Sequence, residues 1–377
     1  MRQLNITAAL LLLMCSVTAS QEPEREKAGI SLLFIGDVMG HDDQIRSALD
    51  TSRGTYYYDD VFQYVNEIIS EADIAIANLE VTLAGAPYRG YPAFSSPAAL
   101  AEGCRNAGID ILATANNHAA DRGKKGINET IRRLDSLGIM HTGTFSGPLE
   151  KDSLHPLLIE SNDFRLALLN YTYGTNGINV PSPVIVNMLA EEEVSADING
   201  ALELDPDVLV LFLHWGTEYD TIPSADQEQL ADHFSKLGAG LIIGSHPHVI
   251  QRMEWEKSDT SGNEKLVAYS LGNFVSNQRK LRTDGGVMLR IDLSREADSV
   301  FISNAGYYLT WVYTPVEEGR KKYYILPCSE FENRPDFFTN PADYRKMRTF
   351  ISNSRNLLGS QNKGIGEIIF SGGNWLY

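Results

Sequence analysis

Short apolar runs alternate with amphipathic stretches along most of this chain. Several of these runs have the length and the composition of buried strands. They lie at residues 30–35, 73–77, 109–113, 165–169, 208–213, 241–243 and 266–270. Between them, apolar residues recur at the spacing of helices that bury one face. Because strands and helices alternate in this way, the pattern predicts a layered α/β fold.

The clearest helix is predicted over residues 224–238. Ser224 and Gln227 have the spacing of a capping box, and Gly238 suits the left-handed position that ends a helix. An apolar stripe of the same kind lies within residues 126–137. Both segments are therefore expected to cover a sheet.

The pattern changes in residues 295–377. Strands are predicted at residues 307–312 and 323–326, and a helix is predicted over residues 340–359 because an Asn-Pro pair begins it. Since no segment rich in Pro, Ser or Gly precedes this region, we expect a C-terminal strand and helix addition packed on the same body.

The first twenty residues have the features of a secretory signal peptide. Arg2 gives a basic start, and the apolar run that follows is too short to span a bilayer. Cys15 leaves a lipoprotein anchor as an alternative. We therefore divide the chain into a signal peptide (1–20), a main domain (21–294) and a C-terminal extension (295–377), and expect export to the periplasm or cell surface.

Composition and charge narrow the classes of partner. Hydrophobic residues make up 43% and charged residues 21% of the chain, as in folded soluble proteins. The formal net charge of −17 disfavours nucleic acid and anionic lipid as partners. Beyond the leader, Cys104 and Cys328 fit either one disulfide or two buried thiols.

Polar residues suited to metal chemistry follow six of the predicted strands. In chain order these residues are Asp37, Asn78, Glu80, Asn116, Asn117, His118, Asp121, His214, Glu218, His246, His248 and Asn273. The carboxyl ends of strands in α/β sheets form the edge at which ligands bind. We therefore expect these side chains to lie close together.

The residue types indicate which ions such a site would hold. Imidazole, carboxylate and amide oxygen suit Mn, Fe or Zn, and thiolate ligands are not supplied. His246 and His248, held on either side of Pro247, are more typical of a ligand pair than of a packed core. The remaining histidines away from strand ends are predicted to be surface residues: His141, His155 and His233.

Six motifs, in order, resemble those of the poly-γ-glutamate capsule-biosynthesis (CapA-like) family. They are GDVM (36–39), NLE (78–80), ATANNHAADRG (113–123), LHWGTEY (213–219), GSHPHVIQ (244–251) and YSLGNFVSNQ (269–278). The resemblance covers roughly residues 30–294. That family is similar to calcineurin-like metallophosphoesterases, which implies a four-layer α/β/β/α sandwich around one or two divalent ions.

The resemblance also implies a role for each matching residue. The implied metal ligands are Asp37, Glu80 (near the position of a bridging aspartate), Asn117, His214, His246 and His248. His118 resembles the catalytic histidine, and we place Asp121 with it. Asn78, Glu218 and Asn273 are expected to face the substrate.

One departure from the metallophosphoesterase pattern concerns the first motif. Met39 stands where that pattern has a histidine ligand, and a thioether does not replace imidazole at a hard cation. His41 comes two positions later, where a loop could still bring it to the site. One metal position is therefore expected to be short of a ligand.

The function implied is metal-dependent hydrolysis or transfer at a phosphoester or amide of an anionic envelope polymer or its precursor. Membrane export or synthesis proteins would be its partners. Two alternatives remain open: a non-catalytic, metal-bearing polymer-binding or anchoring component of a capsule export assembly, and a polymer-trimming amidase.

Overall fold

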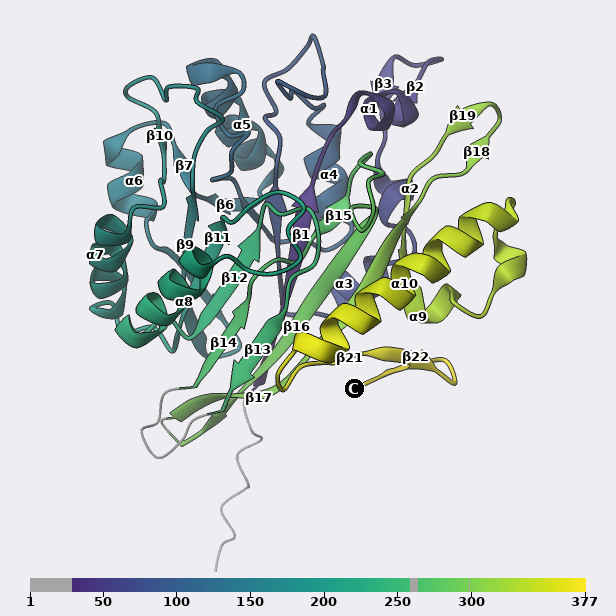
Figure 1. Cartoon of the computed structure of the whole chain (residues 1–377). Helices are drawn as coiled ribbons and strands as arrows, with labels where there is room; N and C mark the ends of the chain where they lie inside the picture. Colours follow the sequence, from purple (N-terminus) through teal and green to yellow (C-terminus); the bar gives the residue numbers. More distant parts are fainter. Residues whose placement is uncertain (1–28, 258–263, 298) are drawn as a thin grey trace, which may run out of the picture.

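The computed structural model of this chain describes residues 29–257, 264–297 and 299–377. The predicted signal peptide and Cys15 lie outside these ranges. Two β-sheets pack face to face within the described residues, with helices on both outer sides (Figure 1). This is the predicted α/β/β/α order of layers, so the fold class is confirmed.

The larger sheet contains most of the N-terminal strands and the long C-terminal hairpin. Its main path runs β20 (Tyr324–Pro327), β17 (Ser299–Tyr313), β16 (Gly285–Glu296), β1 (Gly29–Val38), β4 (Ile74–Leu79), β5 (Ile111–Ala113) and β6 (Met140–Thr142). Two short strands join it, β15 (Asn273–Val275) beside β1 and β21 (Gly366–Glu367) beside β17. The pairs β1–β4, β4–β5 and β5–β6 are parallel, so the carboxyl ends of these strands share one edge.

The smaller sheet is formed by the middle of the chain. Its order is β13 (Met253–Glu256), β14 (Lys265–Ala268), β12 (Leu241–Ser245), β11 (Val208–His214), β9 (Phe164–Thr172) and β8 (Leu157–Ser161). Strands β9, β11, β12 and β14 are parallel. Each strand predicted from an apolar run is present in one of the two sheets.

Side chains alternate between two cores along the buried strands. In β1, Leu32 and Phe34 pack between the sheets, whereas Leu33 and Ile35 pack under the outer helices. Because both faces are covered, the strand reads as one continuous apolar run.

Helices cover the outer face of each sheet. Those on the larger sheet include α2 (Asp59–Phe62), α3 (Asn66–Ser70) and α4 (Ala99–Asn106), and those on the smaller sheet are α7 (Glu191–Leu202) and α8 (Ala225–Leu237). The expected capping box and left-handed C-cap of α8 are both formed. The stripe predicted at residues 126–137 lies in α5 (Gly123–Leu137).

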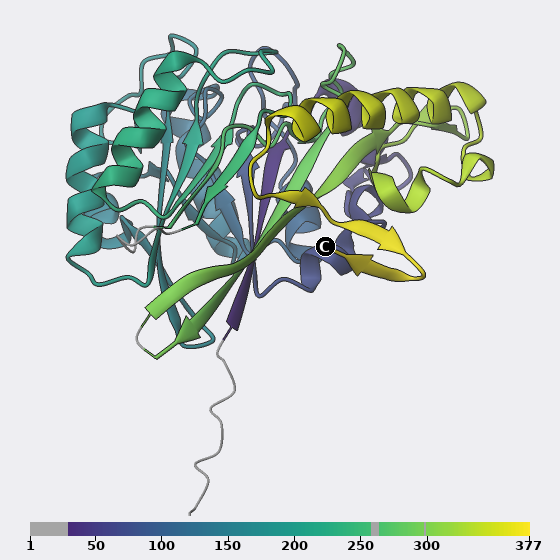
Figure 2. The same ribbon diagram turned by 60° about the horizontal axis from the view of Figure 1, so that its bottom comes forward.

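The last long helix, α10 (Pro341–Gln361), packs on β16 and β17 beside the smaller sheet (Figure 2). Its buried side chains Met347, Phe350, Ile351 and Leu358 belong to the same core as the face between the sheets. The predicted C-terminal strands and helix are thus present. The domain division at residue 294 stays a prediction.

The prediction of a surface position is wrong for two of the three histidines. His155 has a ring that is 4% exposed and lies 3.0 Å from Asp197 Oδ2, and His141 is buried in β6. The hydrogen bonds that these rings make inside the fold were not visible in the sequence. Cys104 and Cys328 are buried free thiols in separate clusters, which is one of the two alternatives left open.

Candidate metal centre

The predicted site residues converge where the carboxyl ends of both sheets meet. In the larger sheet, Asp37 on β1 lies in register with Asn78 on β4 and with Asn273 on β15. Glu80 follows β4 directly, and its backbone N–H donates to the carbonyl of Val38 at 3.0 Å. Parallel pairing thus brings an aspartate, a glutamate and two asparagines together.

The smaller sheet contributes the imidazoles. His214 ends β11 in register with Ser245 on β12, and its Nδ1 lies 2.9 Å from the Ser245 hydroxyl. His246 and His248 follow β12, and both have positive φ angles, 99° and 59°. Left-handed backbone at residues other than glycine is uncommon and is concentrated at functional sites.

The close approach of β12 to its neighbours requires a glycine before this loop. A Cβ on Gly244 would lie 2.0 Å from the carbonyl oxygen of Tyr269 and 2.5 Å from Trp215 Nε1. Only a residue without a side chain lets β12 keep this position. Gly244 therefore fixes where the loop carrying both histidines begins.

Two sets of possible metal ligands share one carboxylate. Glu80, His214 and His246 form the first set, and Asp37, Glu80 and His248 form the second. The ligand atoms within each set lie within 4.8 Å of one another. All of these residues are buried, and Glu80 would be the shared ligand if both sets held a cation.

The first set gains a fourth side chain from Asn117. Its Oδ1 lies 3.1 Å from His214 Nε2, and His214 Nε2 lies 3.8 Å from Glu80 Oε1. Ligands bound to one cation at about 2.1 Å lie roughly 3–4 Å apart. These distances therefore match a common coordination sphere.

The second set has fewer side chains. His248 Nδ1 lies 3.1 Å from Asp37 Oδ2, and His248 Nε2 lies 3.7 Å from Glu80 Oε1. Met39 packs in the core under the outer helices, and His41 begins α1 (Asp42–Ala48) with its Nδ1 3.0 Å from Gln44 Oε1. Among the described residues, neither joins a ligand set, so the loop does not bring His41 into the place of the missing histidine.

Burial sets the charge state of the ligands before any cation binds. Burial raises the pKa of Glu80 well above its usual value, and the charges of Asp37 and Glu218 raise it further. Burial lowers the pKa of His214 well below its usual value and that of His246 to about 3, with neighbouring histidines adding to both shifts. The imidazoles of His214 and His246 are thus neutral, which is the form that binds metals.

The surroundings of the Glu80 carboxylate show whether the site fits a cation. Both of its oxygens are buried, and neither has a hydrogen-bond partner within the described part of the chain. A buried carboxylate without a partner is costly, and metal coordination is one of the few ways to compensate it. The donor set of carboxylate, imidazole and amide oxygen fits a divalent ion of the Mn, Fe or Zn type.

His118 lies beside the ligands on the loop after β5. Its Nδ1 donates to Asp121 Oδ2 at 2.8 Å, and the same oxygen accepts from the backbone N–H of Phe94 at 2.7 Å. The Phe94 ring packs edge-on against the imidazole, with 4.6 Å between ring centroids. The ring is therefore held in one orientation, and Nε2 is the nitrogen available for proton transfer.

The residues expected to face the substrate differ in exposure. Asn78 Nδ2 donates to Asp37 Oδ1 at 2.8 Å, and Asn273 Oδ1 lies 3.1 Å from His248 Nδ1. Both asparagines are buried and position ligands rather than face solvent. Glu218 is exposed, yet near enough for its charge to affect Glu80.

Sequence reasoning missed Tyr173. Its ring lies 4.5 Å from that of His246 and 6.4 Å from that of His214, and the residue is 46% exposed. The available signal was its place directly after β9, a predicted strand to whose carboxyl end no site residue was assigned.

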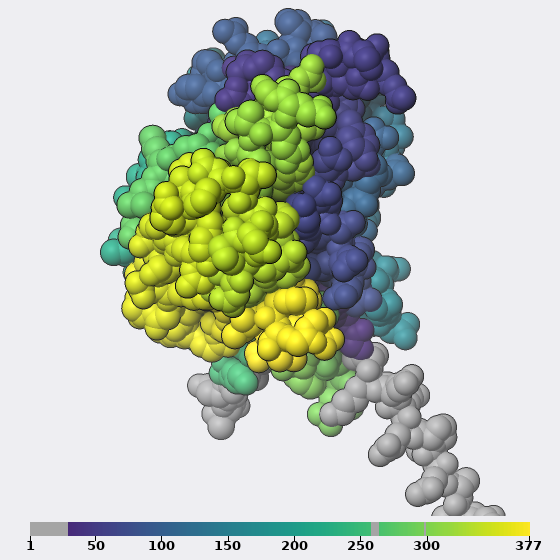
Figure 3. Space-filling model, turned by 90° about the vertical axis from the view of Figure 1, so that its right-hand side faces the viewer, coloured from purple at the N-terminus to yellow at the C-terminus, as the bar shows by residue number. Residues whose placement is uncertain are grey.

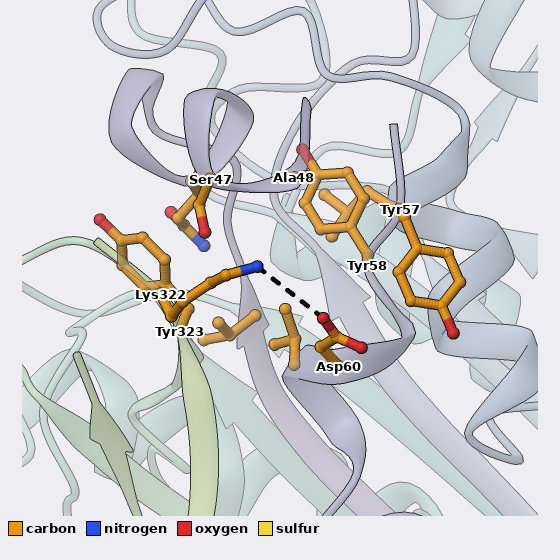
Figure 4. Close-up of a pocket in the computed structure, with 11 residues that line it drawn as sticks. Ser47, Ala48, Tyr57, Tyr58, Asp60, Lys322 and Tyr323 are labelled. Carbon is orange, nitrogen blue, oxygen red and sulfur yellow. Dashed lines mark ion pairs between the residues drawn. The ribbon is translucent and has the colours of Figure 1, made fainter. Parts of the chain in front are cut away.

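A small cavity lies away from this centre, between α1, α2 and the residues that directly precede β20 (Figure 4). Tyr57, Tyr58 and Tyr323 line it, and Lys322 Nζ lies 3.9 Å from Asp60 Oδ2. Its volume of about 20 Å³ is close to the space of one water molecule. It shares no residue with either ligand set.

Residues 31–278 match the sequence model of the family described as bacterial capsule synthesis protein PGA_cap. The capsule biosynthesis protein CapA of Bacillus anthracis is 28% identical over 295 residues, covering 71% of this chain and 65% of that protein. The PGA biosynthesis protein CapA of Bacillus subtilis (strain 168) is 27% identical over 282 residues, covering 72% and 70%. The chain thus spans slightly less than two thirds of the first relative.

A solved structure with a similar arrangement is the calcineurin-like phosphoesterase YfkN from Bacillus subtilis. The TM-score is 0.44 at 10% sequence identity, and the alignment covers 89% of this chain and 99% of that one.

Proposed function

Because this chain belongs to the bacterial capsule synthesis protein family PGA_cap, we propose that it is an exported, metal-dependent hydrolase or transferase. It would act on a phosphoester or amide bond of an anionic envelope polymer or its precursor, alongside membrane proteins that synthesise or export that polymer. The observation that supports this most is the buried Glu80 carboxylate, which two ligand sets share and to which no described residue donates a hydrogen bond.

The side chains of this chain divide into holding and reacting groups. Asp37, Glu80, Asn117, His214, His246 and His248 would hold one or two divalent ions. A divalent ion here supplies Lewis-acid chemistry, because it polarises a phosphoryl or carbonyl oxygen and lowers the pKa of water. Asn78, Ser245 and Asn273 orient ligands through the hydrogen bonds described above.

His118 is the group placed to move a proton. The Asp121 carboxylate fixes its ring through Nδ1, which leaves Nε2 to donate to the leaving oxygen or nitrogen. Phe94 and the loop around it cover one side of the imidazole and limit its contact with water.

The test is an assay of the purified chain with Mn²⁺ or Zn²⁺ on small phosphoesters and on γ-glutamyl peptides. We expect His118→Ala to retain metal and to lose turnover by a factor of about 10²–10⁴. His246→Ala should lose both metal and turnover. The control is His233→Ala, because that side chain is 40% exposed on α8 and should leave both unchanged.

A non-catalytic role is the second candidate. It is favoured by Met39, which leaves the second ligand set with three side chains. In that case the cation would hold carboxylates of the polymer without cleaving it. Metal binding without turnover of any of these substrates, with either ion, would replace the proposal by this one.

Among the helices that the structure describes, none is long and apolar enough to cross a membrane. The signal peptide, the possible lipid anchor at Cys15 and the export that follows from them stay part of the proposal. They can be tested by fractionating cells that express the full chain.

A further inference from the structure

The residues that follow position 278 build a basic pocket beside the candidate metal centre. Its volume of about 800 Å³ falls within the roughly 300–1,000 Å³ usual for ligand sites. The cationic residues that line it are Arg279, Lys280, Arg282, Lys321, Arg345 and Lys346. They come from the loop before β16, from β19 (Arg320–Lys321) and from the first turns of α10.

Most of this positive charge is uncompensated. Asp343 pairs with Lys346 at 2.9 Å, and Asp43 lies 3.9 Å from Lys321. The four other cations have no carboxylate at ion-pair distance anywhere in residues 29–257, 264–297 and 299–377. Asp284, the one acidic residue among the described lining, accepts a hydrogen bond from Trp311. Such a concentration of positive charge is unexpected on a chain of net charge −17.

Two local features indicate that an anion would stabilise the pocket. Arg282 Nε is buried, and no described residue gives it a hydrogen-bond partner. Burial lowers the pKa of Lys321, and the charges of Arg279 and Lys346 lower it further, with Asp43 acting in the opposite direction. A bound oxyanion would relieve this repulsion and complete the hydrogen bonding.

The pocket is connected to the metal centre by direct contacts. Lys280 Nζ lies 3.8 Å from the ring centroid of Tyr219, and the Tyr219 ring lies 6.2 Å from that of His248. The side chain of Asn273, whose Oδ1 contacts His248, donates to the carbonyl of Thr283 at 2.8 Å. A molecule bound against this loop would therefore lie next to the candidate metal-ligating residues.

The pocket belongs to the part of the chain outside the family match. All of its lining residues follow position 278, where the match ends. These C-terminal segments form much of one face of the molecule (Figure 3). The pocket thus lies outside the segment that matches the family model.

We propose that this basic pocket binds consecutive carboxylates of an anionic polymer and holds the chain beside the metal centre. The six cations come from three separate segments of the chain, which matches charges repeated along a polymer. Arginine also binds carboxylates in bidentate fashion. The inference rests on the proposed function for the nature of the polymer.

The test measures binding apart from catalysis. The purified chain, held in EDTA, is titrated into a fluorescent oligo-γ-glutamate of about ten residues and followed by anisotropy at low and high salt. The variant Lys280→Gln/Arg345→Gln removes two exposed cations of the pocket. The matched control, Arg132→Gln/Arg133→Gln, removes the same charge from α5.

We expect the pocket variant to raise the Kd at least tenfold and the control to change it less than twofold, with wild-type binding weakened by salt. Circular dichroism checks that both fold, and Arg282→Gln alone provides a second pocket variant. Equal loss in pocket and control variants, or no binding by the wild type, would overturn the inference. Preference for a polyphosphate of equal length would overturn the carboxylate assignment.

The result separates this inference from the proposed function. A chain that binds the oligomer in EDTA and turns over no substrate with metal contradicts the proposed function alone. A chain that cleaves small substrates and ignores the oligomer contradicts the pocket alone.

Discussion

At the scale of single residues, Glu80 determines most of the chemistry of this centre. Its carboxylate is buried between His214 and His248, and the described residues offer it no hydrogen bond. Such a group destabilises the metal-free fold and favours cation binding. The motif resemblance placed Glu80 near a bridging position, but only the structure showed that no described residue donates a hydrogen bond to its carboxylate.

Glu80→Gln should therefore stabilise the metal-free protein. We expect the free energy of unfolding in EDTA at pH 7 to rise by about 1–3 kcal/mol, because the variant removes a carboxyl group that ionises freely in the unfolded chain but is buried without a hydrogen-bond partner in the described fold. The pKa of Glu80 is raised in the folded protein. Its carboxyl group therefore costs no stability below the ordinary glutamate pKa, and the loss of stability grows as pH rises above that ordinary value. The gain should accordingly shrink toward pH 4.5. The exposed Glu218→Gln is the control, and a less stable Glu80→Gln in EDTA would contradict this account.

Metal affinity should rise with pH for the same reason. Glu80 must lose its proton when a cation binds, whereas His214 and His246, with lowered pKa values, are already neutral. Calorimetry in two buffers of different ionisation enthalpy should show proton release on Zn²⁺ binding near pH 6. Glu80→Gln should bind the ion more weakly and release fewer protons. Proton uptake on binding would be inconsistent with the proposed ligand set.

At the scale of elements, the ends of parallel strands account for the site. The apolar runs were enough to predict the strands, and the polar residues after them were enough to predict convergence at one edge. What the sequence did not contain was the distance between the two sheets, which brings His214 on β11 toward Glu80 after β4. For the same reason Tyr173, after β9, was missed, and the burial of Asn78 and Asn273 was not foreseen.

Gly244→Ala tests this dependence on strand position. The added Cβ would collide with the Tyr269 carbonyl, so β12 must shift and displace the loop that carries His246 and His248. We expect at least a tenfold loss of Zn²⁺ affinity together with a lower melting temperature. Gly200→Ala on α7 is the control, since its added Cβ meets nothing within 4 Å and such a change stabilises a helix by up to about 1 kcal/mol. Equal metal affinity in the two variants would show that β12 does not set the ligand geometry.

At the scale of the whole molecule, the C-terminal segments complete the core. The second sheet leaves part of β16 and β17 uncovered, and α10 packs there (Figure 1). The sequence predicted the helix and its packing on the same body. It did not show that α10 would share the core between the sheets or that the preceding loop would line a basic pocket.

Phe350→Ala should show how much this helix contributes. The Phe350 side chain is 3% exposed and lies against Gly285 of β16, so its truncation should cost about 3–5 kcal/mol. The neighbouring Thr349→Ala, on the exposed side of α10, should change stability by less than about 0.5 kcal/mol. Chemical denaturation of both variants gives the comparison. Similar stabilities would mean that α10 adds little to the core.

The most direct test of the central claim is crystallographic. Crystals of the purified chain grown with Zn²⁺ would be measured at the zinc edge, and the anomalous map would be compared with metal content in solution. The account predicts a strong peak among Glu80, Asn117, His214 and His246, and a weaker one, or none, at Asp37 and His248. Zinc bound only at other residues, or no zinc bound at all, would contradict it.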